Sequence, residues 1–372
     1  MRGAFQIARV FGIPVQIHWT FLLVFVWVFT LSVREDWGVW STVWAVLFVM
    51  ALFFCVVLHE FGHALTARRF GVATRDIILS PIGGVARLDK LPERPWEEFL
   101  VAIAGPLVNI AIVFLLSAYP LLSSELSIQQ LFDFFRQTVN PNSNVFLPEL
   151  SPFNYFILGL ISLNFILALF NMLPAFPMDG GRVLRALLSI KIGRLKATYI
   201  AANVGKLFAL VLIVYGIWEF SLLTSFIGLF VFVTASNEYR MVKLEDTLSR
   251  FTVSDILRRN FTPLFEDESP EKVQQQFKLG AERNFLVFDE WQNIKGILTE
   301  QQLAAIFKNK RSGKVAAFQQ RHYEPVLLQD SLKIAWAKMQ WSNQGILPVY
   351  DKGRLVGVAD EHGLNYFLKQ QR

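Results

Sequence analysis

Six apolar segments in the first two-thirds of the chain constrain its fold more than any other feature of the sequence. A helix needs about 20 mostly apolar residues to cross a lipid bilayer. The segments that qualify or nearly qualify are Ile17–Val33, Trp40–Ala64, Phe99–Leu116, Phe153–Asn171, Tyr199–Trp218 and Leu222–Ser236. Hydrophobic residues make up 53% of the chain and charged residues 18%, an apolar content beyond that of ordinary soluble domains. We therefore expect a multi-pass α-helical membrane protein with about six transmembrane helices in a lipid bilayer.

Lys and Arg lie mainly in alternate loops, and this asymmetry sets the expected orientation of the helices. The N-terminus and the loops after the second and fourth segments are rich in basic residues, whereas the other loops contribute Arg34 and Arg136. We therefore expect both termini in the cytoplasm and the polar loop at about Tyr119–Pro152 outside it. The net charge of +6 is modest and no basic run alternates with aromatic residues, so we expect no nucleic-acid partner.

The second apolar segment ends in the sequence Leu58-His-Glu-Phe-Gly-His63. Residues four apart share a helix face, so His59 and His63 can bind one Zn²⁺ ion. Glu60 lies beside that face, where it can take a proton from a zinc-bound water whose pKa the metal lowers towards ~7. Such polar groups are costly inside a bilayer, by roughly 2.5–3.5 kcal/mol for a central Asp, and mark functional sites by default. The alternative interpretation is that the imidazoles bond to neighbouring helices and Glu60 caps the interface.

A candidate third zinc ligand lies in Asn171-Met-Leu-Pro-Ala-Phe-Pro-Met-Asp-Gly-Gly181. Pro174 and Pro177 interrupt the helix, and the two glycines allow a tight turn. Asp179 is therefore expected on irregular backbone at the cytoplasmic end of the fourth segment, at the depth of the two histidines. Irregular backbone at that depth must be buried in protein or line a wet cavity. The alternative is that Asp179 only caps the next helix.

These motifs resemble those of the site-2 protease family of intramembrane zinc metalloproteases. Ala104-Gly-Pro-Leu-Val-Asn109 matches the A-G-P-x-x-N element of that family, and the similarity covers about residues 1–240. The resemblance implies that Asp179 is the third zinc ligand and that Asn171 is a polar group near the reacting carbonyl. It also implies substrates that are single-pass membrane segments, bent and cut near the cytoplasmic face.

Residues 76–88 (DIILSPIGGVARL) have the β-branched residues and glycines of a hairpin, which we expect near the active site. In the site-2 proteases the corresponding strand is thought to hold substrate in extended form, and this implies substrate contacts at Gly83, Gly84 and Val85. Such contacts fit β-strand addition. We assign Gly105 to close approach of two helices rather than to chemistry.

From about Thr252 onward the sequence contains an internal repeat. The stretch Asn284–Asp289 returns as Gly345–Asp351, and Gly296 and Gly357 are 61 residues apart. Two copies at one offset predict a tandem pair of β-α-β-β-α units.

The repeat resembles a tandem cystathionine-β-synthase-type (CBS) domain over about residues 252–372, which implies a regulatory module that often binds adenine nucleotides. The ribose-binding signature of that family has a hydroxyl residue followed by an Asp. The first copy here has Thr299 but Gln302, and the second has Asp360 and Gly363, so neither copy is complete. Nucleotide binding therefore stays open beside a role as a homodimer interface or substrate-docking platform.

We thus expect a transmembrane zinc metalloprotease domain at 1–245 and a cytoplasmic CBS-like regulatory domain at 252–372. The expected activity is regulated intramembrane proteolysis of membrane-protein substrates by a zinc metalloendopeptidase, in the plasma (inner) membrane of a prokaryote. A CBS-regulated membrane transporter is one alternative, because intramembrane His and Asp residues also line permeation paths. A catalytically dead relative is another, although the intact Glu60 argues against it.

Overall fold

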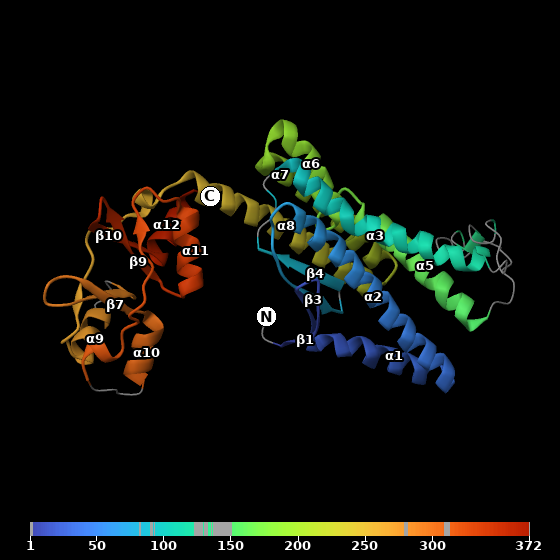
Figure 1. Cartoon of the computed structure of the whole chain (residues 1–372), viewed down its shortest axis with the longest axis horizontal. Coiled ribbons are helices and arrows are strands. Elements are labelled where there is room, and N and C mark those ends of the chain that lie inside the picture. The colour runs from blue at the N-terminus through green and yellow to red at the C-terminus, as the bar shows by residue number, and fades with distance from the viewer. Residues whose placement is uncertain are drawn as a thin grey trace. The chain divides into compact units, whose positions relative to one another are not determined.

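The computed structural model of the chain is shown in Figure 1. It describes residues 3–81, 83–89, 92, 94–122, 129, 133, 134, 136, 151–278, 282–308 and 313–371. Most of the loop expected outside the cytoplasm, Tyr119–Pro152, lies outside the described residues. The chain divides into two compact units, Met1–Tyr239 and Arg240–Arg372. The predicted domain bounds of 1–245 and 252–372 stay predictions.

Within the described residues, five helices are long and apolar enough to cross a membrane. They are α2 (Val39–Arg69), α3 (Pro95–Leu122), α5 (Pro152–Asn171), α7 (Arg194–Trp218) and α8 (Leu222–Arg250). The predicted fold class of a multi-pass helical membrane protein is therefore confirmed.

The first expected span is shorter than predicted. Ile17 and His18 end the strand β2 (Ile13–His18), and the apolar helical stretch that follows runs only from Trp19 to Arg34. It consists of a 3₁₀ turn, η1 (Trp19–Phe21), and α1 (Leu22–Arg34). The apolar residues at the start of this segment form a sheet instead of a helix, so five helices rather than six have spanning length in the described chain.

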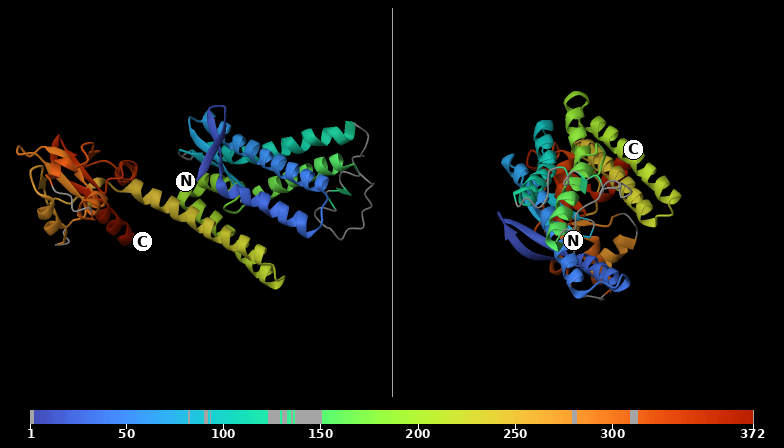
Figure 2. Two further views of the ribbon diagram at one scale, coloured as in Figure 1. Left: turned by 90° about the horizontal axis from the view of Figure 1, so that it is seen from below. Right: turned by 90° about the vertical axis from the view of Figure 1, so that its right-hand side faces the viewer.

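A four-stranded sheet accompanies the helices of the first unit. Its strands are β1 (Ala4–Val10), β2, β3 (Thr74–Ser80) and β4 (Gly83–Leu88), in the spatial order β1-β2-β3-β4. Strands β3 and β4 pair antiparallel, as the hairpin prediction requires, and β2 pairs parallel with β3. Strand β4 is thus an end strand of the sheet. Figures 1 and 2 both show this sheet at one end of the helix bundle.

A short helix, α6 (Asp179–Ile192), follows the irregular segment Met172–Met178 at the end of α5. Asp179, Gly180, Gly181, Arg185 and Ala186 are its buried residues. Gly180 and Gly181 permit the close approach of this turn, because a Cβ at Gly180 would lie 2.3 Å from the carbonyl oxygen of Leu173. The glycine pair therefore packs the start of α6 directly against the preceding irregular backbone.

The second unit contains the predicted repeat. The first copy comprises β5 (Leu264–Phe265), α9 (Pro270–Lys278), β6 (Phe285–Phe288), β7 (Ile294–Leu298) and α10 (Glu300–Lys308). The second comprises β8 (Val326–Leu327), α11 (Leu332–Ser342), β9 (Ile346–Asp351), β10 (Arg354–Asp360) and α12 (Glu361–Gln370). Each copy has the expected β-α-β-β-α order and a three-stranded sheet.

The repeated glycines of this unit have one physical reason in common. A Cβ at Gly296 would lie 2.7 Å from the carbonyl oxygen of Gln320, and one at Gly357 would lie 2.5 Å from that of Arg258. In both copies another backbone segment passes against the strand, through the bridges Ile297–Gln320 and Arg258–Val358. Glycine leaves room for that approach.

Candidate active site and metal centre

His59 and His63 lie on one face of α2, as their spacing predicts. Their Nε2 atoms are 3.1 Å apart, and the side chains are almost completely buried. The Nδ1 atom of His63 lies 2.7 Å from the carbonyl oxygen of Val101 in α3. A carbonyl oxygen can only accept a hydrogen bond, so Nδ1 carries the proton and Nε2 keeps a free lone pair. That tautomer is the one a metal ligand requires.

Asp179 reaches these histidines from α6. Its Oδ2 atom lies 3.3 Å from Nε2 of His59 and 3.2 Å from Nε2 of His63. Within the described part of the chain, this is the one group of three or more metal-ligating side chains whose atoms lie within 4.8 Å of one another. The N-cap residue of α6 is Met178, so capping does not account for Asp179. We call these three residues the His–Asp cluster.

The separations in the His–Asp cluster fit a zinc ion. Tetrahedral bonds of about 2.0–2.1 Å place neighbouring ligand atoms about 3.3 Å apart. The three observed separations are 3.1, 3.2 and 3.3 Å. No Lys or Arg nitrogen of the described residues lies within 4.0 Å of the Asp179 carboxylate. The cluster thus offers three electron-pair donors around a space suited to a bound cation.

Gly105 of α3 borders the same space. A Cβ at this position would lie 2.2 Å from Nε2 of His63 and 2.7 Å from Nε2 of His59. Only glycine therefore fits where α3 passes the two imidazole nitrogens. The sequence predicts close helix approach at Gly105 but not this contact with the two imidazoles. The one sequence signal for this contact is that Gly105 lies in Ala104–Asn109, the stretch that matches the A-G-P-x-x-N element of the site-2 proteases.

Glu60, the proposed general base, is fixed by the sheet. Its Oε2 atom accepts a hydrogen bond of 2.8 Å from the backbone N–H of Ala86 in β4. That N–H points towards α2 and so away from β3. A Cβ at Gly84 would lie 2.8 Å from Cγ of Glu60, so β4 passes close to α2 at this point. The hairpin predicted near the active site is therefore in contact with Glu60.

The remaining predicted residues have different surroundings. Gly83, Gly84 and Val85 begin β4, and the Val85 side chain is 57% exposed. Asn171 is the last residue of α5 and is half-buried. Within the described residues, no hydrogen bond joins the Asn171 side chain to the His–Asp cluster, so its role near a reacting carbonyl stays a prediction.

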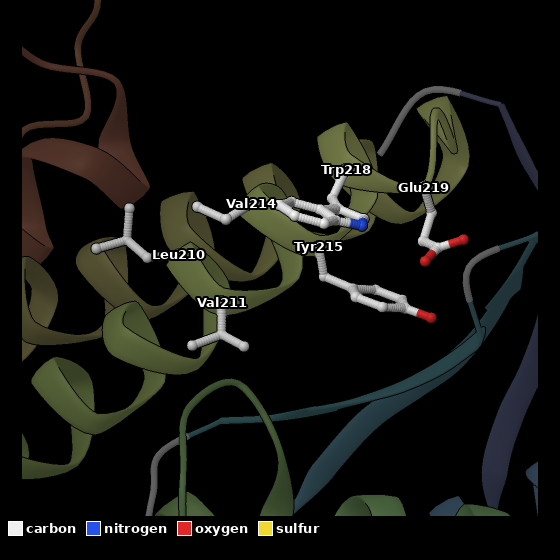
Figure 3. Close-up of a pocket in the computed structure, with 6 residues that line it drawn as sticks. All are labelled: Leu210, Val211, Val214, Tyr215, Trp218 and Glu219. Carbon is white, nitrogen blue, oxygen red and sulfur yellow. The ribbon is translucent and has the colours of Figure 1, made fainter.

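Two cavities lie elsewhere. An apolar cavity of about 490 Å³ on α7 is shown in Figure 3. Leu210, Val211, Val214, Tyr215, Trp218 and Glu219 line it, and none of these is a predicted site residue. The other cavity, of about 670 Å³, lies in the second unit. There Arg258 donates to Glu282 at 2.8 Å and pairs with Asp360 at 2.9 Å, so Asp360 is already partnered.

Comparison with known proteins places the chain in a family. Residues 47–212 match the model of peptidase family M50. Zinc metalloprotease MJ0392 of Methanocaldococcus jannaschii is 39% identical over 272 residues, which are 73% of this chain and 71% of that protein. The solved site-2 protease from the same organism is 36% identical, with a TM-score of 0.44, and covers 63% of this chain and 95% of its own.

A second structural comparison concerns the C-terminal part. The CBS domain pair of protein MJ0100 aligns with 32% of this chain and 98% of its own, at 17% identity and a TM-score of 0.30. The sequence match to MJ0392 shows the family that the motifs indicated. This chain belongs to peptidase family M50, the site-2 protease family, and is a zinc-dependent metalloendopeptidase built on membrane-spanning helices.

Proposed function

We propose that the enzyme cleaves peptide bonds in or near transmembrane segments of membrane proteins, with His59, His63 and Asp179 as zinc ligands and Glu60 as general base. One observation carries this proposal: three ligand atoms from α2 and α6 converge within 4.8 Å at the end of an apolar helix. The neighbouring carboxylate of Glu60 remains outside the ligand group. A water and a substrate carbonyl need that combination for hydrolysis.

His59, His63 and Asp179 would hold the zinc ion, which when bound would supply Lewis acidity to polarise the scissile carbonyl and to lower the pKa of water towards neutral. Glu60 receives the proton that this water loses and later delivers it to the leaving amine. The Ala86 N–H holds one oxygen of Glu60 and leaves Oε1 as the atom that exchanges protons. Within the described residues, no Lys or Arg nitrogen lies within 4.0 Å of the Glu60 carboxylate.

The substrate approaches as an extended strand along β4. An end strand has unpaired backbone groups that can bind another strand. Gly83, Gly84 and Val85 lie on this strand, and the Ala86 N–H points from it to Glu60. A peptide paired with the outer edge of β4 would therefore lie beside the general base. Because a helix offers no free backbone groups for such pairing, the substrate segment must unwind before it is cut.

The orientation of the protein follows from the basic residues near the cluster. Arg68 and Arg69 end α2, one to two turns beyond His63. Under the positive-inside rule this end of the helix faces the cytoplasm of a prokaryotic cell, as do both termini. The repeat of the second unit then lies in the cytoplasm as a regulatory module. The repeat binds either a nucleotide, in the 670 Å³ cavity, or a second copy of the chain.

Cleavage of a model single-span substrate in liposomes tests the proposal, with wild type, Glu60→Gln and a zinc chelator compared. We expect Glu60→Gln to keep its zinc and to lose at least about 100-fold in kcat, because the base is gone while the ligands remain. Glu219→Gln, an exposed change at the end of α7, serves as the matched control and should cleave like wild type. Equal cleavage by Glu60→Gln would refute the role of the base. Absence of cleavage by zinc-loaded wild type across several substrates would favour a transporter or an inactive relative.

A further inference from the structure

Arg185 of α6 is the largest completely buried side chain in the described structure, with 0% of its surface exposed. Its Nε donates to Glu98 of α3 at 2.7 Å, and its Nη1 donates to Glu238 of α8 at 2.7 Å. A second ion pair joins Nη2 to Glu98. We call these three residues the Arg185 cluster. It joins three helices that are far apart in the sequence.

Such a cluster is not explained by stability alone. Burying an arginine and a carboxylate costs desolvation energy that their attraction only roughly repays, and apolar replacements are often as stable. The planar guanidinium instead fixes direction, because its donors form a rigid fork that two carboxylates occupy at defined angles. The Arg185 cluster therefore sets how α3, α6 and α8 lie against one another.

The same arginine is rigidly connected to Asp179. Both residues belong to α6, six residues apart, which corresponds to a rise of about 9 Å. The guanidinium also lies over the ring of Phe176, at 4.9 Å from its centroid. Phe176 precedes Asp179 by three residues and is 1% exposed. Arg185 thus contacts the irregular segment before Asp179 and belongs to the helix after it.

Helix α8 also packs against that segment. Ala235 of α8 packs in one cluster with Phe176 and with Ala201 and Ala202 of α7. Glu238, one turn later, holds Arg185. The helix then continues without a break to Arg250, where Leu248 belongs to a hydrophobic core of the second unit. The residue that bonds Arg185 and the residue that enters this core therefore both lie on α8.

We propose that Arg185 is the positioning residue that holds Asp179 at the metal centre, and that its bond to Glu238 makes this position depend on α8. The proposal rests on the assignment of Asp179 as a zinc ligand in the proposed function. A shift of α8 against α6 would change the Glu238–Arg185 bond, and α6 would carry the change to Asp179. Glu98 anchors the opposite side of the guanidinium to α3, the helix that also contains Gly105.

Glu238→Ala and Glu238→Gln test the proposal on the full-length protein, and Asn237→Ala, an exposed neighbour on α8, is the matched control. The readouts are zinc affinity, the absorption spectrum of the cobalt-substituted protein, and kcat and KM for a model substrate. We expect Glu238→Ala to weaken zinc binding about 10-fold, the low end of what loss of a direct contact to a metal ligand costs, because Glu238 acts on Asp179 through Arg185 and α6. The cobalt spectrum should change and kcat should fall while KM stays within about twofold. Glu238→Gln keeps the acceptor oxygen and should lose only about fivefold in zinc affinity.

The outcomes separate positioning from plain structural support. If Glu238→Ala lowers thermal stability but keeps the wild-type zinc affinity and cobalt spectrum, Arg185 does not position Asp179. If Glu238→Ala fails to fold, Glu238→Gln decides, and zinc affinity equal to that of Asn237→Ala overturns the proposal. The same measurements on Asp179→Ala test whether Asp179 is a metal ligand. A wild-type cobalt spectrum in that variant would count against the proposed function, whereas a changed spectrum there with no effect at Glu238 would count against positioning alone.

Discussion

The His–Asp cluster and the Arg185 cluster lie in the same unit and are built in opposite ways. Each brings buried charged or polar side chains together from different helices. The Arg185 cluster includes its own cation, which the carboxylates of Glu98 and Glu238 neutralise. The His–Asp cluster has a carboxylate and two imidazoles, but no Lys or Arg of the described residues within 4.0 Å of that carboxylate. A buried cluster that lacks a cation of its own is suited to bind one from outside.

The two clusters also differ in the side chains that surround them. The aromatic ring of Phe176 covers the guanidinium of Arg185, so that cluster is filled by protein. Gly105 presents no side chain to the imidazole nitrogens of His59 and His63, where a Cβ would clash with both rings. The first arrangement fixes the helices in place, and the second provides three ligands where a catalytic zinc site would need three.

The largest expected effect comes from removing the carboxylate of the His–Asp cluster. Asp179→Ala should weaken zinc binding by more than about 100-fold, because loss of an outer contact alone typically costs up to that amount. Metal analysis after dialysis against graded zinc buffers measures the change. Asp246→Ala, which removes a carboxylate on α8 paired with Arg250, is the control and should bind zinc like wild type. Unchanged zinc affinity in Asp179→Ala would mean that the ligand set is wrong.

Filling the space beside the cluster should have the next largest effect. Gly105→Ala places a methyl group 2.2 Å from Nε2 of His63, so the helices must separate or the ion must leave, and zinc affinity should fall by at least about 10-fold. Gly159→Ala is the matched control, because its Cβ would meet only the ring of Phe48, at 2.9 Å. Equal losses in zinc affinity for the two variants would show that Gly105 matters for packing alone.

Glu60 differs from Glu98 and Glu238 in being held by a backbone N–H rather than by an arginine. Ala86→Pro removes that N–H, and an outward-pointing donor on an end strand is a position where proline is tolerated. We expect kcat to fall about 10-fold with zinc content unchanged, because the base is no longer oriented. Ala86→Ser keeps the N–H and should cleave at nearly the wild-type rate. A proline variant with wild-type kcat would remove Ala86 from the mechanism.

The smallest effect on zinc binding and catalysis is expected from a change at Glu98, which bonds Arg185 to α3. Glu98→Gln keeps the shape of the side chain but removes a buried negative charge beside Arg185, at a cost of about 1–3 kcal/mol in stability. The thermal midpoint in detergent should fall by about 5 °C. Zinc affinity should change less than in Glu238→Ala, because the bond to α8 remains. A larger loss of zinc affinity than of stability would place Glu98 closer to the metal centre than its contacts indicate.

Local patterns were sufficient to predict much of the site. The four-residue spacing of His59 and His63 placed both on one face of α2, and the proline and glycine residues before Asp179 indicated a break in the helix at the right place. Both signals depend on neighbouring residues, so they do not require knowledge of tertiary packing. The β-α-β-β-α repeat was likewise visible as a constant offset of 61 residues.

Features that depend on distant partners were missed. Arg185 and Glu98 are separated by 87 positions, and nothing near either residue indicates the other. Gly105 resembled an ordinary helix-packing glycine, because only the fold places His59 and His63 opposite it. The first expected span begins two residues later than predicted for a related reason: Ile17 and His18 pair with β1 in a sheet whose other half begins at Thr74. Hydropathy along the chain does not report such pairing.

The most direct test of the account is zinc K-edge X-ray absorption on the purified full-length protein. We predict one zinc ion per chain with two imidazole nitrogens and one carboxylate oxygen at about 2.0–2.1 Å, and no sulfur. Buried Cys55, one helical turn before His59, is the only thiol in the chain and the natural source of any sulfur signal. The same spectrum should persist in Glu60→Gln and change in Asp179→Ala. Sulfur in the first shell, or one spectrum shared by wild type and Asp179→Ala, would contradict the assignment of the His–Asp cluster as the catalytic zinc site.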